Sequence, residues 1–364
     1  MYWINTPLPD KISLIIPTYN EKGNIAPLFE RISKALSGYN YEIILVDDNS
    51  RDGTIETAQA LSKQYPVKVI VRKDEKGLST AVTHGMKFAD GQIIGVMDAD
   101  LQHPPEVLPK LVKAIEDGAD MAAASRYVPG GGAPNFGFTR RVISKVALEI
   151  CHILLPSTRR VKDPMTGFFM FKKGPIEGKE LKPIGYKIIL EVMLMGDFKN
   201  IVEVPFVFEE RSAGRSKLRA RTQIDYLHHL FSLMRRTGEF KRFLKFIGVG
   251  LSGTLVNEGV LLLTKSLTSW DPKIQLIPGI EVSIITNFLL NDYFTFADRR
   301  TGKTGSFLGR LGKYNLLALA GAVINWGLAS LLTHAGLNIY LADFIGIVIA
   351  FLWNYFFSTI WAWK

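Results

Sequence analysis

The sequence predicts an α/β domain with a mostly parallel sheet, followed by amphipathic interfacial helices and a four-helix transmembrane domain. Two observations carry this prediction. Up to about residue 240, short apolar stretches alternate with amphipathic ones, and charged residues are scattered through both. Beyond that point the apolar runs lengthen, and residues 314–342 and 344–363 contain no Asp, Glu, Lys or Arg. We expect domains at 1–221 and 243–364, joined by an amphipathic helix at 222–242.

Short apolar segments alternate with helical segments in the first domain, which indicates a parallel sheet covered by helices. We expect strands at 12–17, 41–47, 67–72, 93–98, 122–125 and 202–208. We expect helices at 21–37, 54–65, 78–89, 105–116 and 139–155. Ligands of such sheets bind beyond the carboxyl ends of the strands. The residues that follow each strand are therefore the candidates for a functional site.

Polar, mostly acidic side chains follow three of these strands. The first strand leads into 17–21, the second into Asp47 and Asp48, and the fourth into Asp98 and Asp100. Carboxylates gathered at one rim repel one another, and a divalent cation or donors such as ribose hydroxyls relieve this repulsion. Mg²⁺ and Mn²⁺ take a few carboxylates and share their other positions with water and phosphates. A single acidic turn also fits a helix cap, but three at successive strand ends favour a binding site.

Basic residues are placed where they can meet phosphate groups. Arg126 follows the 122–125 strand, and Arg140, Arg141 and Ser144 lie in the first turns of the 139–155 helix. Arginine pairs well with phosphate, and a helix N-terminus adds N–H donors. The apolar side of this helix predicts that it lies on a bilayer, and attraction to the membrane surface is the alternative reading of its arginines. The basic segment 211–221 has no interleaved aromatic residues, so we expect phosphate or headgroup binding there and no nucleic acid.

The composition excludes several classes of protein. The 364 residues are 47% hydrophobic, which excludes a disordered chain. The single cysteine, Cys151, excludes an internal disulfide framework. Residues 1–11 contain two prolines and no long apolar core, so we expect no secretory signal.

The apolar runs of the second domain predict four membrane spans at 243–264, 275–297, 312–333 and 340–361. Lys and Arg are concentrated before the first span and between the second and third, while the loop at 334–338 has none. Positive residues favour the cytoplasmic side. We therefore expect an integral protein of the plasma or endoplasmic reticulum membrane, with both termini and the first domain in the cytoplasm.

The membrane domain contains an internal repeat. Gly253 and Asn257 recur as Gly321 and Asn325 with a shift of 68 residues, and the segment 288–294 resembles 351–357 with a shift of 63. We expect one helical hairpin used twice, with glycine and asparagine as helix-packing residues. Transport of a lipid-linked product is the alternative function of this domain, and the intramembrane acid Glu258 is consistent with it.

The motifs of the first domain resemble a known family. They read IIPTYNE at 15–21, VDDNSRDGT at 46–54, MDADLQHPP at 97–105, DPMTGFF at 163–169, GYK at 185–187 with Glu191, and RSAGRSK at 211–217. They are similar to family 2 glycosyltransferases of the Rossmann-like GT-A fold and, more narrowly, to polyprenyl-phosphate (dolichyl-phosphate) mannose synthases. The second domain resembles the small GtrA-like membrane domain.

The resemblance implies inverting transfer of mannose from GDP-mannose to dolichyl (polyprenyl) phosphate, with Mg²⁺ or Mn²⁺ as cofactor. The product would be dolichyl β-D-mannosyl phosphate, a lipid-linked donor for protein glycosylation. A polyprenyl-phosphate glucosyltransferase using UDP-glucose stays open, because no motif reads the stereochemistry of the sugar. A flippase for lipid-linked sugars with a regulatory soluble domain also stays open.

The resemblance also implies roles for individual residues. The nucleotide sugar would be bound by Pro17, Tyr19, Glu21, Val46, Asp48, Asp98, Ala99, Asp100, Gln102, Arg126, Lys187, Arg211 and Lys217. The acceptor phosphate would be bound by Arg126, Arg140, Ser144 and Arg211. The metal would be held by Asp98, Asp100 and Gln102, and the catalytic residues would be Asp100 and Arg126. A phosphate acceptor is largely dianionic at neutral pH, so we expect no general base.

Overall fold

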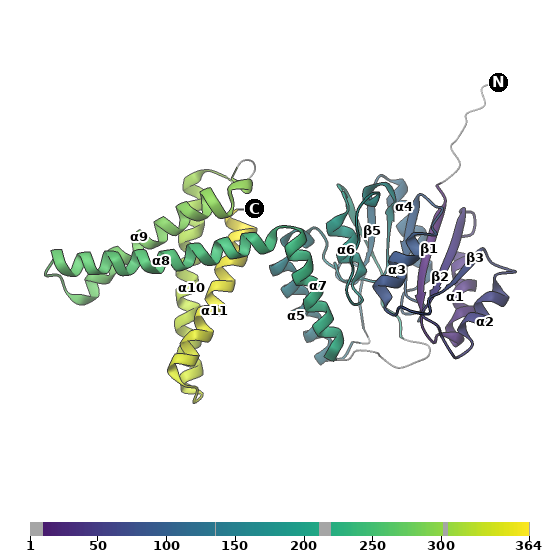
Figure 1. Ribbon diagram of the computed structural model, residues 1–364, viewed down its shortest axis with the longest axis horizontal. Helices are drawn as coiled ribbons and strands as arrows, with labels where there is room; N and C mark the ends of the chain where they lie inside the picture. Colours follow the sequence, from purple (N-terminus) through teal and green to yellow (C-terminus); the bar gives the residue numbers. More distant parts are fainter. Residues whose placement is uncertain (1–9, 135, 211–219, 301–304, 364) are drawn as a thin grey trace, which may run out of the picture. The chain divides into compact units, whose positions relative to one another are not determined.

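The computed structural model describes residues 10–134, 136–210, 220–300 and 305–363 of the chain. Figure 1 shows its helices and strands. The chain forms two compact units, Met1–Thr237 and Gly238–Lys364. The first membrane helix, α8 (Glu239–Leu267), begins four residues before the expected start of the membrane domain at 243.

The first unit is built on a seven-stranded sheet in the order β3-β2-β1-β4-β6-β5-β7. The strands are β1 (Ile12–Thr18), β2 (Tyr41–Asp47), β3 (Val67–Val71), β4 (Ile93–Val96), β5 (Met121–Ser125), β6 (Phe169–Lys172) and β7 (Ile201–Pro205). β1 pairs in parallel with both β2 and β4. The loops that follow these three strands therefore emerge together at one edge of the sheet, as expected for a parallel sheet with a site at its carboxyl edge.

Two elements of this unit were absent from the expected set. β6 is antiparallel to both β4 and β5 and lies between them. This strand has only four residues, three of them buried, and carries no alternating pattern, so its pairing is not visible in the local sequence. The helix α6 (Ile188–Met195) is buried along most of its length and lacks a polar face, so it has no amphipathic period either.

Helices cover both faces of the sheet. One face packs against α1 (Lys22–Ala35), α2 (Thr54–Leu61) and α4 (Leu108–Glu116), which bury Leu14 and Ile16 of β1 in the main core. The other face packs against α3 (Leu78–Met86), as its contacts with β1 and β2 show. Gly85 allows this approach, because a Cβ there would come within 2.9 Å of Ile15 and Val46 side chains.

Two longer helices complete the first unit, namely α5 (Phe138–Leu154) and α7 (Ala220–Arg236). The Tyr226 hydroxyl on α7 donates a hydrogen bond to the Ala147 carbonyl on α5 at 2.8 Å. The buried carboxylate of Glu191 on α6 accepts hydrogen bonds from Arg236 of α7 at 2.5 Å and from the Lys182 N–H at 2.7 Å. Of the helix expected at 222–242, residues 222–236 belong to α7, which these bonds join to the rest of the first unit at Tyr226 and Arg236.

In the described part of the second unit, four helices are long and apolar enough to cross a membrane. Their candidate spans are Glu239–Leu267, Ile274–Thr295, Phe307–His334 and Ile339–Ala362. They comprise α8, α9 (Pro272–Leu290), α10 (Phe307–His334) and α11 (Ile339–Phe357), with π-helical turns at Asn291–Thr295 and Ser358–Ala362. α8 packs along α9, and α10 packs along α11, so the unit consists of two hairpins.

Glycine and asparagine pack against each other in the same way in both hairpins. Gly253 faces the Asn287 side chain, and Gly321 faces Asn354, so that a Cβ on either glycine would overlap the amide. Asn287 and Asn354 are 67 residues apart. The shift of 63, which aligns Asn291 with Asn354, is therefore wrong by one helical turn. The error arises because residues four apart on a helix share a face and repeat similar side chains.

Candidate active site

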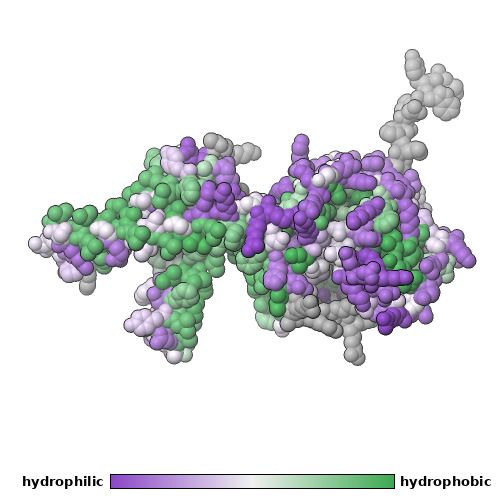
Figure 2. Space-filling view, in the orientation of Figure 1, coloured by the Kyte–Doolittle hydropathy of each residue, from purple (hydrophilic) through white to green (hydrophobic). Residues whose placement is uncertain are grey.

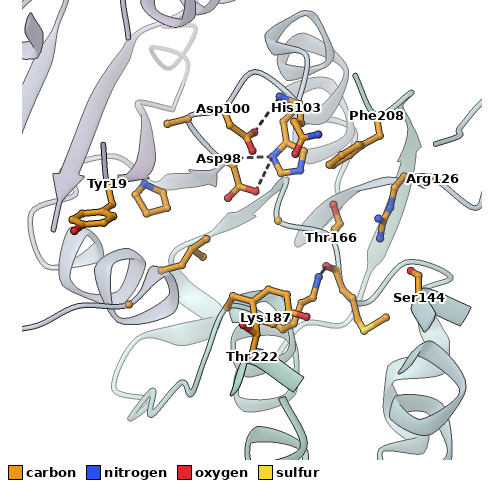
Figure 3. A pocket seen from close by; sticks show the side chains of 18 of the residues that line it. Tyr19, Asp98, Asp100, His103, Arg126, Ser144, Thr166, Lys187, Phe208 and Thr222 are labelled. Carbon is orange, nitrogen blue, oxygen red and sulfur yellow. Dashed lines mark hydrogen bonds and ion pairs between the residues drawn. The ribbon is translucent and has the colours of Figure 1, made fainter. Parts of the chain in front are cut away.

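The first unit contains a cavity of about 630 Å³ at the carboxyl ends of β1, β2 and β4. Figure 3 shows the side chains that line it. Of the residues expected in the site, the lining includes Pro17, Tyr19, Glu21, Asp48, Asp98, Ala99, Asp100, Gln102, Arg126, Arg140, Ser144 and Lys187. Residues from nearly the whole length of the first unit therefore meet in one place.

Among the described residues that were expected in the site, Val46 is not in this lining. Val46 is fully buried in β2 and packs on the side of the sheet that faces Gly85. Alternate residues of a strand point to opposite faces of the sheet, and this side chain is part of the core. Arg211 and Lys217 lie outside the residues that the structure describes.

The turn after β4 presents two carboxylates to the cavity. The side chain of Asp98 is 32% exposed, and Asp100 is 7% exposed. The Asp100 carboxylate accepts a hydrogen bond from the Gln102 N–H at 3.2 Å, which closes a tight turn. Leu101 within this turn has a φ of 62°, a left-handed conformation that costs a leucine about 1 kcal/mol or more. The turn is therefore held in a strained shape that directs both carboxylates toward one region (Figure 3).

His103 lies behind this turn and was given no role in the sequence analysis. Its Nδ1 accepts a hydrogen bond from the Asp98 N–H at 3.1 Å, and its ring stacks on Phe168 with centroids 5.3 Å apart. Burial lowers the pKa of His103 to about 4, so the ring is neutral at neutral pH. Because Nδ1 accepts, the ring hydrogen is on Nε2. His103 thus supports the backbone of Asp98. Its place in the 97–105 motif was the signal that could have identified it.

Gly167 leaves room for this arrangement. A Cβ at this position would lie 3.1 Å from Cε1 of His103 and 3.2 Å from Oδ2 of Asp98. Both distances are tighter than ordinary van der Waals contact. The glycine of the 163–169 motif therefore permits the close approach of β6 to the acidic turn.

The acidic turn fits a divalent cation that is shared with a substrate. No group of three or more His, Cys, Asp or Glu residues that could hold a metal is found among the described residues. The protein instead offers two carboxylates, while the Gln102 side-chain N–H is engaged by the Glu209 carbonyl at 3.3 Å. Mg²⁺ and Mn²⁺ commonly bind through one or two carboxylates together with water and substrate phosphates. Asp98 and Asp100 are therefore a suitable but incomplete ligand set.

Arg126 is held rigidly in the cavity wall by Asp163. Its Nε and Nη2 donate to the two carboxylate oxygens at 2.7 and 2.8 Å, and its backbone N–H donates to the same carboxylate at 3.1 Å. Asp163 is fully buried. Burial opposes the charge of Arg126, but these hydrogen bonds outweigh it and raise the pKa of the guanidinium. A permanently charged, oriented fork is suited to a phosphate ligand.

Arg140 and Ser144 reach the cavity from α5. The guanidinium of Arg140 lies over the Phe136 ring, 3.9 Å from its centroid. The Ser144 hydroxyl forms a hydrogen bond of 3.1 Å with the Tyr127 hydroxyl. Arg140 and Ser144 are four residues apart and so share one face of the helix. Both residues line the cavity, so this face of α5 is directed at it.

Lys187 is a further cation in the lining of the cavity. Its Nζ donates to the Met165 carbonyl at 2.7 Å. Burial, followed by the neighbouring charge of Arg126, lowers the pKa of Lys187 to about 8. The amine of Lys187 is thus mostly protonated at neutral pH, but it loses its proton more readily than an ordinary lysine does. A phosphate ligand beside it favours the charged form.

A separate ion pair organises the end of the cavity near Tyr19. Asp48 accepts hydrogen bonds from Arg72 at 2.5 and 2.8 Å and from the Gly77 N–H at 2.7 Å. Lys76 lies 4.7 Å from the centre of the Tyr19 ring. Arg72 and Lys76, which follow β3, were not expected in the site. Tyr186, Thr222 and Gln223 also line the cavity unexpectedly.

Comparisons with known proteins agree with these motifs. Residues 13–177 match the model of the glycosyl transferase family 2, and residues 245–363 match that of the GtrA/DPMS transmembrane domain. The dolichol-phosphate mannosyltransferase of Pyrococcus furiosus is 50% identical over 94% of this chain and 96% of its own length. That of Saccharomyces cerevisiae is 41% identical over 61% of this chain and 86% of its own length.

Solved structures show the same fold at low sequence identity. Glucosyl-3-phosphoglycerate synthase from Mycobacterium tuberculosis in complex with Mn²⁺, UDP-glucose and phosphoglyceric acid is 20% identical, with a TM-score of 0.50. The match covers 63% of this chain and 80% of that chain. Mannosyl-3-phosphoglycerate synthase from Rubrobacter xylanophilus is 16% identical, with a TM-score of 0.50 over 63% of this chain and 75% of that chain.

Proposed function

Because the chain belongs to the dolichol-phosphate mannosyltransferases of glycosyl transferase family 2, we propose that it transfers mannose from GDP-mannose to dolichyl phosphate. The transfer inverts the anomeric carbon and yields dolichyl β-D-mannosyl phosphate, a lipid-linked donor for protein glycosylation. One observation supports this proposal above all others. The carboxylates of the turn after β4, Asp98 and Asp100, line the same cavity as the cations Arg126, Arg140 and Lys187.

The acidic part of the cavity serves the donor in this proposal. Tyr19 and the Asp48–Arg72 pair would form the nucleoside end, and Asp98, Asp100 and Gln102 would hold a divalent cation. Such a cation supplies charge neutralisation of the leaving diphosphate. His103 and Gly167 act on this step only indirectly, because they fix the backbone and the side-chain space of Asp98.

The basic part serves the acceptor. Arg126 and Arg140 offer planar donor groups to the phosphate, and Ser144 adds a hydroxyl. A phosphate oxygen attacks the anomeric carbon, and the bond from that carbon to the diphosphate breaks on the opposite face. The acceptor is already largely dianionic at neutral pH, so no proton is removed. The contribution of the protein is to position two anions and to offset their repulsion.

The second unit holds the protein in the membrane, where the acceptor is dissolved. Its four spans give an integral membrane protein. We place both termini and the cavity on the cytoplasmic side of the plasma or endoplasmic reticulum membrane, because Lys and Arg are enriched before α8 and between α9 and α10. The lipid phosphate then reaches the cavity at the membrane surface.

The test is transfer of radiolabelled sugar to dolichyl phosphate by the purified full chain. We expect label in the lipid fraction from GDP-mannose and none from UDP-glucose. Asp100→Asn should reduce the rate at least about 100-fold, whereas Asp74→Asn, in an exposed loop after β3, should leave it unchanged. Label from UDP-glucose alone would establish a glucosyltransferase. Absence of label in the lipid from either nucleotide sugar would overturn both transferases and favour a regulatory soluble domain.

A further inference from the structure

A second cavity, of about 880 Å³, lies on another side of α5. Arg140, Ser144 and Ala147 of this helix line the candidate active site, whereas Arg141, Lys145 and Leu148 line the second cavity. Each set repeats every three to four residues, so each occupies its own face of α5. Phe136 belongs to both linings and is part of the wall between the two cavities.

The second cavity carries a positive charge that is not neutralised. Arg141, Lys145 and Lys162 contribute three cations, and Glu149 is the one carboxylate among the described residues of the lining. Among the described residues, neither Lys145 nor Lys162 has a carboxylate within 4.0 Å, whereas many other surface lysines of this unit are paired. His152 adds a ring nitrogen, Nε2, that is buried and has no hydrogen-bond partner in the described part of the chain. These groups suit an anionic ligand with several acceptor oxygens.

An exposed apolar stripe runs along α5 next to these cations. Phe138 is 83% exposed, and Val142 and Val146, at intervals of four residues, are also exposed. Figure 2 shows apolar surface at the place of α5 and α7. The remaining lining of the cavity is mostly apolar, with Tyr127, Pro134 and Leu148. A free phosphate ion uses only the cations, whereas a phospholipid uses both surfaces, with its phosphate in the cavity and its chains along the stripe.

We propose that this second cavity binds the phosphate headgroup of one anionic phospholipid, with the acyl chains lying along Phe138, Val142 and Val146. The site is separate from the proposed acceptor site and does not depend on the proposed function. Its occupant would nevertheless touch the active-site wall. Tyr127 lines the second cavity and is hydrogen-bonded to Ser144 of the first at 3.1 Å.

Native mass spectrometry of the detergent-solubilised full chain tests the proposal, with phosphatidylglycerol as the probe. Lys145→Gln and Lys162→Gln should each reduce the lipid-bound fraction about fivefold, since one cation near an anionic lipid is worth about that factor. Lys110→Gln is the matched control, because Lys110 is an exposed lysine of α4 outside the cavity. It should leave the bound fraction unchanged.

A cavity-filling variant separates a built site from general attraction to the surface. Leu148→Trp keeps every charge but occupies the cavity, so it should lower phosphatidylglycerol binding as strongly as Lys145→Gln, with circular dichroism confirming the fold. Phosphatidylcholine should bind less than phosphatidylglycerol and equally in all variants. Binding that is unchanged in both Lys145→Gln and Leu148→Trp would overturn the site. Displacement of the lipid by an equal concentration of inorganic phosphate would overturn the lipid assignment.

Discussion

Arg126 and Asp163 are joined through both carboxylate oxygens, by hydrogen bonds of 2.7 and 2.8 Å, in a buried part of the cavity wall. Arg126 directly follows β5, and Asp163 lies in the segment that precedes β6, a neighbour of β5 in the sheet. The orientation of the guanidinium therefore depends on a strand that interrupts the parallel order.

Asp163→Asn should destabilise the first unit by about 3–5 kcal/mol, because it leaves a buried guanidinium without its charge partner. Transfer should fall as well, since Arg126 loses its fixed orientation. Thermal unfolding and initial rates measure the two effects. The control is Asp197→Asn, whose ion pair with Lys179 is at the surface, and which should change stability by less than about 1 kcal/mol. Equal stability of the two variants would contradict this account of the pair.

Gly167→Ala should weaken binding of the divalent cation about tenfold or more, which is the usual effect of disturbing groups behind metal ligands. The new methyl group would press on His103 and on the Asp98 carboxylate. The measurement is the Mn²⁺ concentration that gives half-maximal transfer. Gly174→Ala, with nothing within 4 Å of its Cβ position, is the control at the end of β6. An unchanged Mn²⁺ requirement in Gly167→Ala would remove the role assigned to this glycine.

The apparent KM for the anionic substrates should rise about fivefold between pH 8 and pH 9. The pKa of Lys187 is lowered to about 8, first by burial and then by Arg126. Below this pKa the ammonium is charged and attracts phosphate, and above it the attraction is lost, so binding weakens as pH rises. Lys187→Arg keeps its charge over this range and should abolish the step. If the apparent KM still rises between pH 8 and pH 9 in this variant, the rise comes from the titration of another group.

Some residues of the cavity could be placed from the sequence, whereas the contacts that hold others could not. Asp98, Asp100 and Arg126 could be placed because each directly follows a strand with a strong apolar pattern, and parallel strands bring such positions to one edge. The Arg126–Asp163 pair could not, because it depends on the antiparallel insertion of β6. The bonds of Lys187 to Met165 and of Asp48 to Arg72 join segments separated by at least 22 residues. No local periodicity encodes such contacts.

In the membrane domain, the sequence predicts the two hairpins but not which of their residues correspond. Its division into two hairpins follows from the lengths of the apolar runs, because each span needs about 20 residues. The alignment of the two hairpins with each other does not follow from these lengths. Asn287 and Asn291 are one helical turn apart, and either matches Asn354 almost equally well. The packing of Gly253 on Asn287 and of Gly321 on Asn354 decides between them.

Asp292→Asn should destabilise the second unit by about 3–5 kcal/mol. Asp292 accepts two hydrogen bonds from Arg310, at 2.8 and 3.1 Å, and one from the Trp363 ring N–H at 2.8 Å, all in a buried environment. Of these three hydrogen bonds, Trp363→Phe removes only the one from the ring N–H. It should lower the free energy of unfolding by about 1–3 kcal/mol. The readout is thermal unfolding of the full chain in detergent. Trp326→Phe, at an exposed position of α10, should have no effect. Destabilisation of all three variants to the same extent would contradict a specific role for Asp292.

The central proposal is that Asp98 and Asp100 would hold a divalent cation, whose charge would offset the repulsion between two anionic substrates in one cavity. It is tested most directly by the rate of mannose transfer to dolichyl phosphate before chelation, after removal of divalent cations with EDTA, and after their return as Mn²⁺. We predict that wild-type transfer is lost on chelation and restored by Mn²⁺, while Asp98→Asn and Asp100→Asn recover little of it. Full transfer by the wild-type protein in excess EDTA would contradict the claim.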